Sequence, residues 1–323
     1  MAVATKPKVT PKIYKPEFPI DWCPGCGDFG IVNAIHQALA RLNIPRHNVA
    51  VVGGIGCSGK AQYHVSTYGV HTLHGRPVPY ATGIRLANPH LHVIVVSGDG
   101  DSMAIGAGHF VNAGRRNVNF TYLMFNNEVY GLTKGQAGPT LPLGLQTKSL
   151  PEPNMNAAVN PLMLALASGY TWIGRGYSYN IRHLVNLIVQ AIEHPGSAFL
   201  DILQPCPTYN DLHTKEWFSG EDIGHGRLYD LQEEGYDPVI PENADEDTVR
   251  AKLLHFIEKA QEWGDRIPIG VFLVNKNIDT YEERINRRVG NYFEAPPATR
   301  PLADEDGVTL TDLTPIFEEY LMS

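Results

Sequence analysis

The chain has 323 residues, 43% of them hydrophobic, and its 26 basic and 34 acidic residues give a net charge of −8. This length suggests about two domains, although one α/β domain with extensions fits equally well. The acidic balance and the lack of a basic block exclude nucleic acid as an expected partner, and no apolar run reaches the roughly 20 residues that span a membrane.

The first segment, residues 1–20, is rich in Lys and Pro and has no hydrophobic centre. Because a secretory signal needs such a centre, we expect a cytoplasmic protein that starts with an extended arm. A Cys-x-x-Cys turn, Cys23 to Cys26, follows the arm. The next residues predict an amphipathic helix over 29–42, with Asp28 as its N-cap.

A short β-branched run at 49–52 predicts a buried strand, which ends in a Gly-rich segment with Cys57. A loop with His71 and His74 comes next, and then a helix is predicted over 79–87. The two histidines have no third ligand nearby in the sequence, so they do not indicate a metal site.

Two apolar runs, at 91–96 and 120–125, predict neighbouring buried strands. A helix is expected between them over residues 101–114, with Asp101 or Ser102 at its N-cap. A strand, a crossover helix and a second strand are the unit of a parallel sheet covered by helices. We therefore predict an α/β fold with a doubly wound, mostly parallel sheet.

Polar residues follow both of these strands. Gly98-Asp99-Gly100 comes after the first strand and Asn127 after the second. Because the carboxyl ends of parallel strands and the N-termini of their helices meet at one edge, these residues face one crevice. Asp99 and Asn127 offer the oxygens that a hard divalent cation prefers, and the N–H groups after Gly98 suit a diphosphate.

The fourth cysteine, Cys206, follows a strand predicted over 198–203. Because the other three also follow a strand or precede a helix, all four thiols are expected at the sheet edge that holds Asp99. Four thiols in a cytoplasmic protein indicate a metal centre more readily than disulfides. Zinc, an iron–sulfur cluster and buried inert thiols all stay open on the residues alone.

Beyond the central motif, a loop rich in Gly, Pro and Thr covers residues 134–148. Later helices and strands are expected, in order, over residues 154–168, 181–193, 198–203, 248–263 and 267–274. The last third has many acids and few apolar runs. We expect an arm (1–20), a cofactor-binding domain (21–210) and a C-terminal extension (211–323) that packs on a partner subunit.

The Gly98-Asp99-Gly100 turn with Asn127 resembles the thiamine diphosphate motif, and residues 128–133 resemble a segment of the 2-oxoacid:ferredoxin oxidoreductases. The resemblance implies the thiamine diphosphate-binding type of sheet, with Mg²⁺ held by Asp99, Asn127 and the Val129 carbonyl. Other residues implied to contact the cofactor are Ile55, Gly56, Cys57, Ser58, His74, Gly75, Gly98, Gly100, Asp101, Gly131, Leu132 and Thr133.

The cysteine segments also resemble those of the family's beta subunit, which has Trp-Cys-Pro-Gly-Cys-Gly, Gly-Cys-Ser and Pro-Cys-Pro. The resemblance implies one four-iron four-sulfur (4Fe-4S) cluster, with Cys23, Cys26, Cys57 and Cys206 as its ligands. Zinc remains the alternative occupant of these thiols.

The His-x-x-His-Gly-Arg segment at residues 71–76 is similar to that of the 2-oxoglutarate enzymes of the family. On this resemblance His74 lies beside the cofactor, whereas His71 and Lys60 lie near the substrate. Lys60 would meet the substrate carboxylate, and a solvated loop lysine is the alternative.

The implied reaction is the coenzyme A-dependent oxidative decarboxylation of 2-oxoglutarate to succinyl-CoA and CO₂, with electrons passed through the cluster to ferredoxin. Pyruvate or another 2-oxo acid is the alternative substrate. The chain offers no acid opposite the aminopyrimidine ring, and the family takes that glutamate from its alpha subunit. We therefore expect an alpha subunit as partner, in a heterodimer or an α2β2 assembly, and a chain that is inactive alone.

A zinc-stabilised, non-catalytic interaction subunit is an alternative from another functional class. A non-redox thiamine decarboxylase or carboligase is a third possibility, but it leaves the four cysteines unexplained.

Overall fold

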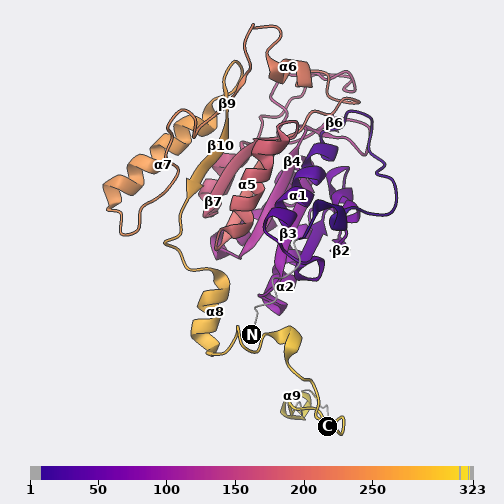
Figure 1. The fold of residues 1–323 in the computed structure, drawn as a ribbon, viewed down its shortest axis with the longest axis vertical. Coiled ribbons are helices and arrows are strands. Elements are labelled where there is room, and N and C mark those ends of the chain that lie inside the picture. Colours follow the sequence, from indigo (N-terminus) through magenta and orange to yellow (C-terminus); the bar gives the residue numbers. More distant parts are fainter. Residues whose placement is uncertain (1–8, 313, 319, 321–323) are drawn as a thin grey trace, which may run out of the picture.

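The computed structural model describes residues 9–312, 314–318 and 320. Within these residues, eight strands form one sheet in the order β2-β1-β3-β4-β8-β7-β10-β9, and helices cover both faces (Figure 1). The strands from β2 to β7 in this order are parallel, whereas β10 runs antiparallel to β7. The predicted doubly wound, mostly parallel α/β fold is confirmed.

The central strands are apolar runs because helices bury both of their faces. All residues of β1, β4 and β8 are buried, and β3 is accessible only at its two ends. The strands of the sheet are β1 (Val49–Gly53), β2 (Tyr68–His71), β3 (His92–Gly98), β4 (Phe120–Asn126), β7 (Trp172–Tyr177), β8 (Ser197–Leu203), β9 (Leu228–Asp230) and β10 (Ile267–Val274). A separate small hairpin joins β5 (Val129–Tyr130) to β6 (Gln136–Ala137).

Two hydrophobic cores lie on the two faces of the sheet. Side chains alternate between them along each strand, so Ile94 packs in one core and Val95 in the other. The first core is covered by α1 (Asp28–Arg41) and α5 (Ile181–Glu193). The second core is covered by α2 (Pro77–Ala87), α3 (Ala107–Arg116), α4 (Pro161–Ser168) and α7 (Glu246–Gln261).

Three predicted helix starts are wrong for local reasons. The N-cap of α1 is Gly27, and Asp28 is already the first helical residue. Helix α4 begins at Pro161 because the Asn160 side chain accepts hydrogen bonds from the next two backbone N–H groups and caps the helix there. The helix expected over 101–114 is instead a π-helical turn, Gly100–Ile105, followed by α3.

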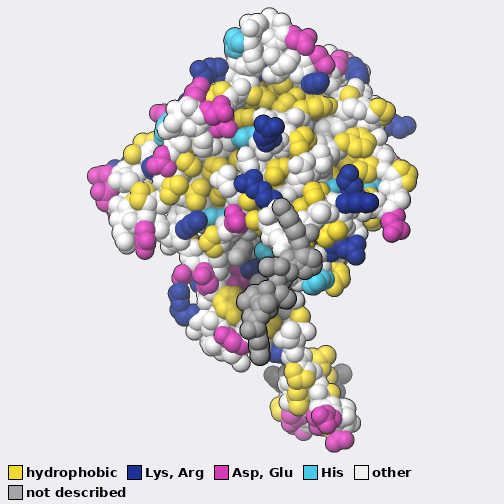
Figure 2. Space-filling view, viewed as in Figure 1, with side chains coloured by type: hydrophobic (Ala, Val, Ile, Leu, Met, Phe, Trp, Pro, Cys, Tyr) yellow, Lys and Arg dark blue, Asp and Glu magenta, His cyan; other side chains and the backbone are white. Residues whose placement is uncertain are grey.

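The C-terminal third completes the central sheet and then leaves it. Strand β10 inserts between β7 and β9. After it comes α8 (Tyr281–Val289), which begins with a capping box between Thr280 and Glu283. The short helices are α6 (Lys215–Ser219) and α9 (Thr314–Glu318), and the chain runs away from the sheet towards α9 (Figure 1). Hydrophobic side chains gather on this last segment (Figure 2), among them Leu302 and Val308, both exposed.

Only the second half of the predicted N-terminal arm lies within the described residues. It contains a 3-10 turn, Pro11–Tyr14, and Tyr14 is fully buried with its hydroxyl donating to the Ile44 carbonyl. This part of the arm is therefore packed on the sheet domain and is not extended. None of the helices described is both long and apolar enough to cross a membrane.

Candidate functional site

A cavity of about 200 Å³ opens at the carboxyl ends of β1, β3 and β4. Loops that follow different strands contribute its walls, as expected where the connections of a doubly wound sheet diverge. All the predicted cofactor-contacting residues except Gly75 line it, and Tyr130 joins them. The lining residues are Ile55, Gly56, Cys57, Ser58, His74, Gly98, Asp99, Gly100, Asp101, Asn127, Val129, Tyr130, Gly131, Leu132 and Thr133.

Asp99 is the buried acid of this cavity. Its Oδ2 accepts a hydrogen bond from the Thr140 hydroxyl at 2.9 Å. Burial, and secondarily the nearby Glu128, raises the pKa of Asp99 to about 7. Asn127 and Val129 line the same cavity and supply an amide oxygen and a backbone carbonyl. A buried carboxyl with two neutral oxygens fits a hard divalent cation, because the cation would offset the cost of ionising the carboxyl.

Asp101 has a different function from the predicted helix cap. Its Oδ1 accepts hydrogen bonds from the backbone N–H groups of Ile55 at 3.1 Å and Gly75 at 2.6 Å, and lies 2.6 Å from His74 Nδ1. Its Oδ2 accepts from the Ser97 hydroxyl at 2.6 Å. The carboxylate thus ties the loops after β1, β2 and β3 together, which leaves no free oxygen to cap a helix.

Glycines at the cavity wall allow other groups to approach the backbone closely, because they have no side chain. A Cβ atom at Gly100 would lie 2.3 Å from the Tyr130 ring. A Cβ atom at Gly131 would lie 3.4 Å from Cys57 Sγ and 4.0 Å from Cys206 Sγ. Glycine at position 100 therefore leaves room for the Tyr130 ring at the cavity wall, and glycine at position 98 leaves room for the Ser58 hydroxyl.

The four cysteines lie at the same sheet edge as the cavity. Cys57 lines the cavity itself, and the Cys57 and Cys206 sulfur atoms both lie close to Gly131. The Gln204 amide lies 3.3 Å from Cys26 Sγ, and Cys23 is exposed. All four are free thiols.

Burial raises the pKa of Cys57 to about 12, and it also raises the pKa values of Cys26 and Cys206. Nearby Asp28 adds to the effect at Cys26. Thiols this buried ionise only beside a strong positive charge, so the donor set fits a metal centre that stabilises thiolates. The described residues include no group of three or more His, Cys, Asp or Glu side chains spaced to hold one metal ion.

Two residues predicted to lie near the substrate are outside the cavity lining. Lys60 forms an ion pair with Asp21 at 2.6 Å, which lowers the pKa of the Asp21 carboxyl. His71 is exposed at the end of β2, where its Nδ1 lies 2.7 Å from the Tyr63 hydroxyl. His74, by contrast, lines the cavity. Because Lys60 and His71 do not, the roles expected for these two residues stay predictions.

Sequence reasoning did not assign Thr140, Asp201 or Tyr130 to this region. Thr140, from the long loop, lies between Asp99 and Asn126 and within hydrogen-bonding distance of both, at 2.9 and 2.8 Å. The Asn126 amide in turn donates to Asp201 at 3.0 Å. The Gly- and Pro-rich sequence around Thr140 holds no signal for this contact, whereas Tyr130 stands inside the motif segment and could have been included.

Comparisons with known proteins agree with this geometry. A family model described as the C-terminal TPP binding domain of thiamine pyrophosphate enzymes matches residues 26–202. A second model, the C-terminal part of the pyruvate ferredoxin oxidoreductase beta subunit, matches residues 206–288. The first match covers the whole cavity and two of the four cysteines, Cys26 and Cys57, and the second begins at Cys206.

Relatives match over most of the chain or over more than half of it. The 2-oxoacid:ferredoxin oxidoreductase subunit beta of Saccharolobus solfataricus is 51% identical over 304 residues, which cover 93% of this chain and 96% of the relative. The 2-oxoglutarate oxidoreductase subunit KorB of Mycobacterium tuberculosis is 45% identical over 192 residues, or 59% of this chain and 52% of the relative.

A solved structure of 2-oxoglutarate:ferredoxin oxidoreductase from Magnetococcus marinus, with 2-oxoglutarate, coenzyme A and succinyl-CoA bound, superposes with a TM-score of 0.77. Its sequence is 32% identical, and the match covers 99% of this chain and 98% of that chain. The cavity, the cysteine edge and the matches along the whole chain lead to one conclusion: this chain belongs to the beta subunits of the 2-oxoacid:ferredoxin oxidoreductases.

Proposed function

We propose that this chain is the catalytic beta subunit of an enzyme that converts 2-oxoglutarate and coenzyme A to succinyl-CoA and CO₂ and passes the electrons to ferredoxin. The observation that supports this most directly is that Cys57 lines the same cavity as Asp99 and Asn127. A thiolate-held electron acceptor and a magnesium diphosphate site would then share a wall. This arrangement suits an oxidative reaction, because electrons could leave the reacting carbon over a short distance.

The oxygens of Asp99, Asn127 and Val129 would hold Mg²⁺, and the backbone around Gly98 would hold the diphosphate. Thiamine diphosphate, when bound, supplies the electron sink for decarboxylation of a 2-oxo acid. His74, fixed by Asp101 at 2.6 Å, would present its ring to the cavity. Ser58, buried beside Gly98, narrows the diphosphate end of the cavity.

The four cysteines would hold a 4Fe-4S cluster. In such a cluster each thiolate binds a different iron, so the sulfur atoms are spread more widely than around a single tetrahedral ion. The match of the chain to beta subunits of ferredoxin-linked enzymes supports an electron-transfer cluster over zinc. A zinc-stabilised, non-catalytic subunit remains the competing proposal.

The substrate is the least constrained part of the proposal. The Magnetococcus marinus structure and the KorB relatives are named for 2-oxoglutarate and support it as the substrate. However, the relatives that match at 48 to 52% identity across almost the whole chain are named only for 2-oxoacids. This favours, as the second candidate, an enzyme that also accepts pyruvate or other 2-oxo acids.

An alpha subunit is part of the proposal, as the name of the beta-subunit relatives implies. Within the described cavity lining the only acids are Asp99 and Asp101, and both are engaged at the diphosphate end. A partner would supply the acid that faces the aminopyrimidine ring. We further propose that the apolar C-terminal segment, with Leu302, Val308 and Leu310 exposed, packs on that partner.

The test is anaerobic. The chain would be mixed with its alpha partner, thiamine diphosphate, Mg²⁺ and coenzyme A, and the visible absorption of the cluster followed after adding 2-oxoglutarate or pyruvate. Bleaching with 2-oxoglutarate alone supports the full proposal, and equal bleaching with pyruvate supports the broad-substrate candidate. No bleaching by either substrate, in a complex that contains iron and acid-labile sulfide, overturns the reaction.

Metal analysis separates the cluster from zinc before any activity is measured. The proposal requires about four iron and four sulfide per chain. One zinc and no sulfide, in anaerobically purified protein, would contradict it and favour the non-catalytic subunit.

A further inference from the structure

Glu128 lies between Asn127 and Val129, two residues proposed to hold Mg²⁺, but its side chain does not line the cofactor cavity. Its backbone is in the left-handed region, with φ of +66°, which non-glycine residues rarely adopt. The side chain is buried, with 6% of its surface exposed. An acidic residue in a strained, buried position requires partners that fix it there.

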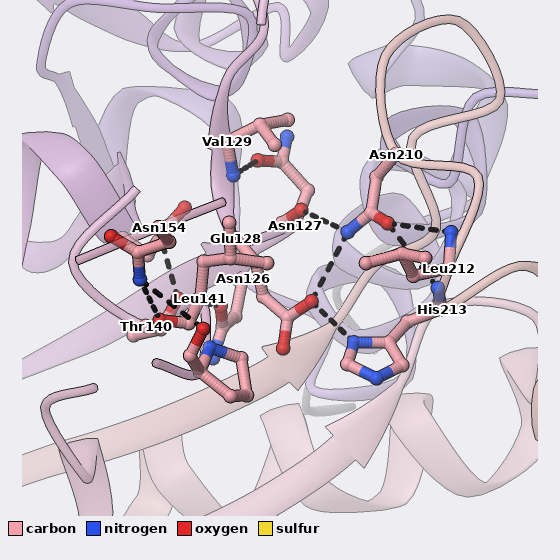
Figure 3. Close-up of polar contacts among 12 residues, drawn as sticks. Asn126, Asn127, Glu128, Val129, Thr140, Leu141, Asn154, Asn210, Leu212 and His213 are labelled. Atoms are coloured by element: carbon pink, nitrogen blue, oxygen red, sulfur yellow. Dashed lines mark hydrogen bonds and ion pairs between the residues drawn. The ribbon is translucent and has the colours of Figure 1, made fainter. Parts of the chain in front are cut away.

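Two residues from the loop after the fourth cysteine are those partners (Figure 3). Glu128 Oε2 accepts a hydrogen bond from Asn210 Nδ2 at 3.1 Å and lies 2.5 Å from His213 Nδ1. His213 is held in turn by the Trp217 ring, with the ring centroids 4.3 Å apart. The Glu128 carbonyl also accepts from the Gly138 backbone N–H at 2.7 Å. The peptide unit between the two proposed ligands is therefore fixed from two sides.

Asn210 connects this network to Cys206. Its Nδ2 donates to the Asn127 carbonyl at 3.0 Å, and its backbone N–H donates to the Cys206 carbonyl at 3.0 Å. The side-chain oxygen accepts from the backbone N–H groups of Leu212 and His213, at 3.0 and 3.2 Å. Asn210 is buried. Its backbone contacts the loop of a proposed cluster ligand, and its side chain contacts the loop of two proposed magnesium ligands.

We propose that Glu128, Asn210 and His213 are positioning residues that couple the two metal sites, so that occupancy of the cysteines tightens the binding of magnesium and thiamine diphosphate. This inference rests on the proposed function. The coupling has a physical basis, because thiolate binding by Cys206 fixes the 206–213 loop, and that loop holds the conformation of Glu128 and Asn127. Coupling between sites is reciprocal, so the bound cofactor must favour the cluster by the same factor.

The experiment uses the complex of this chain with its alpha partner and compares two equilibria. The Kd of thiamine diphosphate at fixed Mg²⁺ is measured by equilibrium dialysis, with the cluster present and after its removal by a chelator. We expect the cluster to lower this Kd about tenfold. Iron should also be lost to the chelator more slowly when thiamine diphosphate and Mg²⁺ are present.

The Asn210→Ala variant removes the link and should bring the ratio of the two Kd values close to one. His213→Phe is the second variant: it preserves the ring that packs on Trp217 but loses the nitrogen beside Glu128, and it should lower the ratio in part. The matched control is Asn154→Ala. Asn154 is also buried and also bonds loop carbonyls (Figure 3), those of Leu141, Pro142 and Asn156, so its loss should lower stability and leave the ratio unchanged.

The coupling would be overturned if the Kd of thiamine diphosphate were the same with and without the cluster in the unmodified complex. It would also be overturned if Asn210→Ala and His213→Phe both kept the same Kd ratio as the unmodified complex. The ratio separates positioning from a general loss of stability, which weakens both affinities together. A complex that binds no thiamine diphosphate, or contains no iron and sulfide, would instead overturn the proposed function.

Discussion

At the scale of single residues, the site depends on a few buried carboxylates with different surroundings. Asp99 has one hydroxyl partner and faces the cavity, whereas Asp101 is surrounded by donors from two loops and from strand β3. Both follow the same strand, two residues apart. Their environments therefore separate a proposed ligand from an organising residue, although their side chains are chemically identical.

Replacing Asp101 with Asn should destabilise the protein. The amide keeps its oxygen towards the Ile55 and Gly75 backbone N–H groups, but its NH₂ group then faces the Ser97 hydroxyl, which loses its acceptor, and a buried donor without a partner costs about 1–3 kcal/mol. Denaturant unfolding measures the change in the free energy of unfolding. Asp211→Asn is the control, since exposed Asp211 accepts one backbone hydrogen bond from Lys148 at 2.7 Å. Equal stability of the two variants would contradict the organising role of Asp101.

A second residue-scale prediction concerns pH. Burial lowers the pKa of His194 to about 4, and its Nε2 lies 2.8 Å from the Thr171 hydroxyl. An unfolded histidine titrates near 6.5, so between about pH 6.5 and 4 the unfolded chain binds a proton that the folded chain does not. The free energy of unfolding should therefore fall as the pH is lowered through this window, with His194 contributing about 3 kcal/mol.

The measurement is urea unfolding of the isolated chain at a series of pH values, for the unmodified chain and for His194→Gln. The variant should lose less stability between pH 6.5 and 4. Other buried histidines, such as His36, also have a lowered pKa and leave part of the slope in place. His47→Gln, at an exposed histidine, should keep the full slope. Identical slopes for the unmodified chain and His194→Gln would refute the assignment.

At the scale of elements, sequence patterns succeed where a helix or strand is fixed by its own residues. The predicted bounds of α5 and β10 are confirmed, because each is a strong periodic or apolar run between clear breakers. The predicted start of α4 is seven residues too early, since the Asn154 side chain bonds loop carbonyls and Asn160 caps the helix. Such side-chain to backbone contacts depend on the folded loop.

Helix α8 is attached to the rest of the domain by a buried ion pair between Glu282 and Arg85. Glu282 is buried, receives a hydrogen bond from Arg85 Nε at 2.6 Å and accepts the backbone N–H of Asn119 at 3.1 Å. Truncating Glu282 to Ala leaves the Arg85 charge without its partner, which typically costs about 3–5 kcal/mol for a buried pair. Amide hydrogen exchange within α8 should accelerate in Glu282→Ala, and not in Glu294→Ala, where the acid is exposed. Unchanged exchange in α8 would show that other contacts hold it.

At the scale of the whole molecule, the sequence predicts which residues share an edge of the sheet, but it does not predict which of them contact one another. The thiols and the acid were placed together because strand ends of a parallel sheet meet. By contrast, the contact between Glu128 and Asn210 joins residues 82 positions apart. Strand β10 is antiparallel to β7, but its apolar run has the same sequence pattern as a parallel strand would have. Neither follows from a local pattern, since both depend on tertiary packing.

The exposed C-terminal segment leads to a prediction about assembly. Its apolar side chains, among them Leu302 and Phe317, are more than half exposed in the described part of this chain. A chain truncated after Arg300 should still bind thiamine diphosphate, Mg²⁺ and the cluster, but should bind the alpha partner more weakly. Size-exclusion chromatography of the mixed subunits measures this. Asp306→Asn in the full-length chain is the control for a polar change in the same segment, and undiminished assembly of the truncated chain would contradict the prediction.

The insertion of β10 also has a consequence for synthesis on the ribosome. The parallel strands up to β8 can pair as soon as residues up to 203 have emerged, but the outer side of β7 then has no neighbour. Unpaired strand edges template association with other chains. Until β10 emerges and pairs antiparallel with β7, the nascent chain is therefore exposed to aggregation there, and chaperone binding would matter most during this interval.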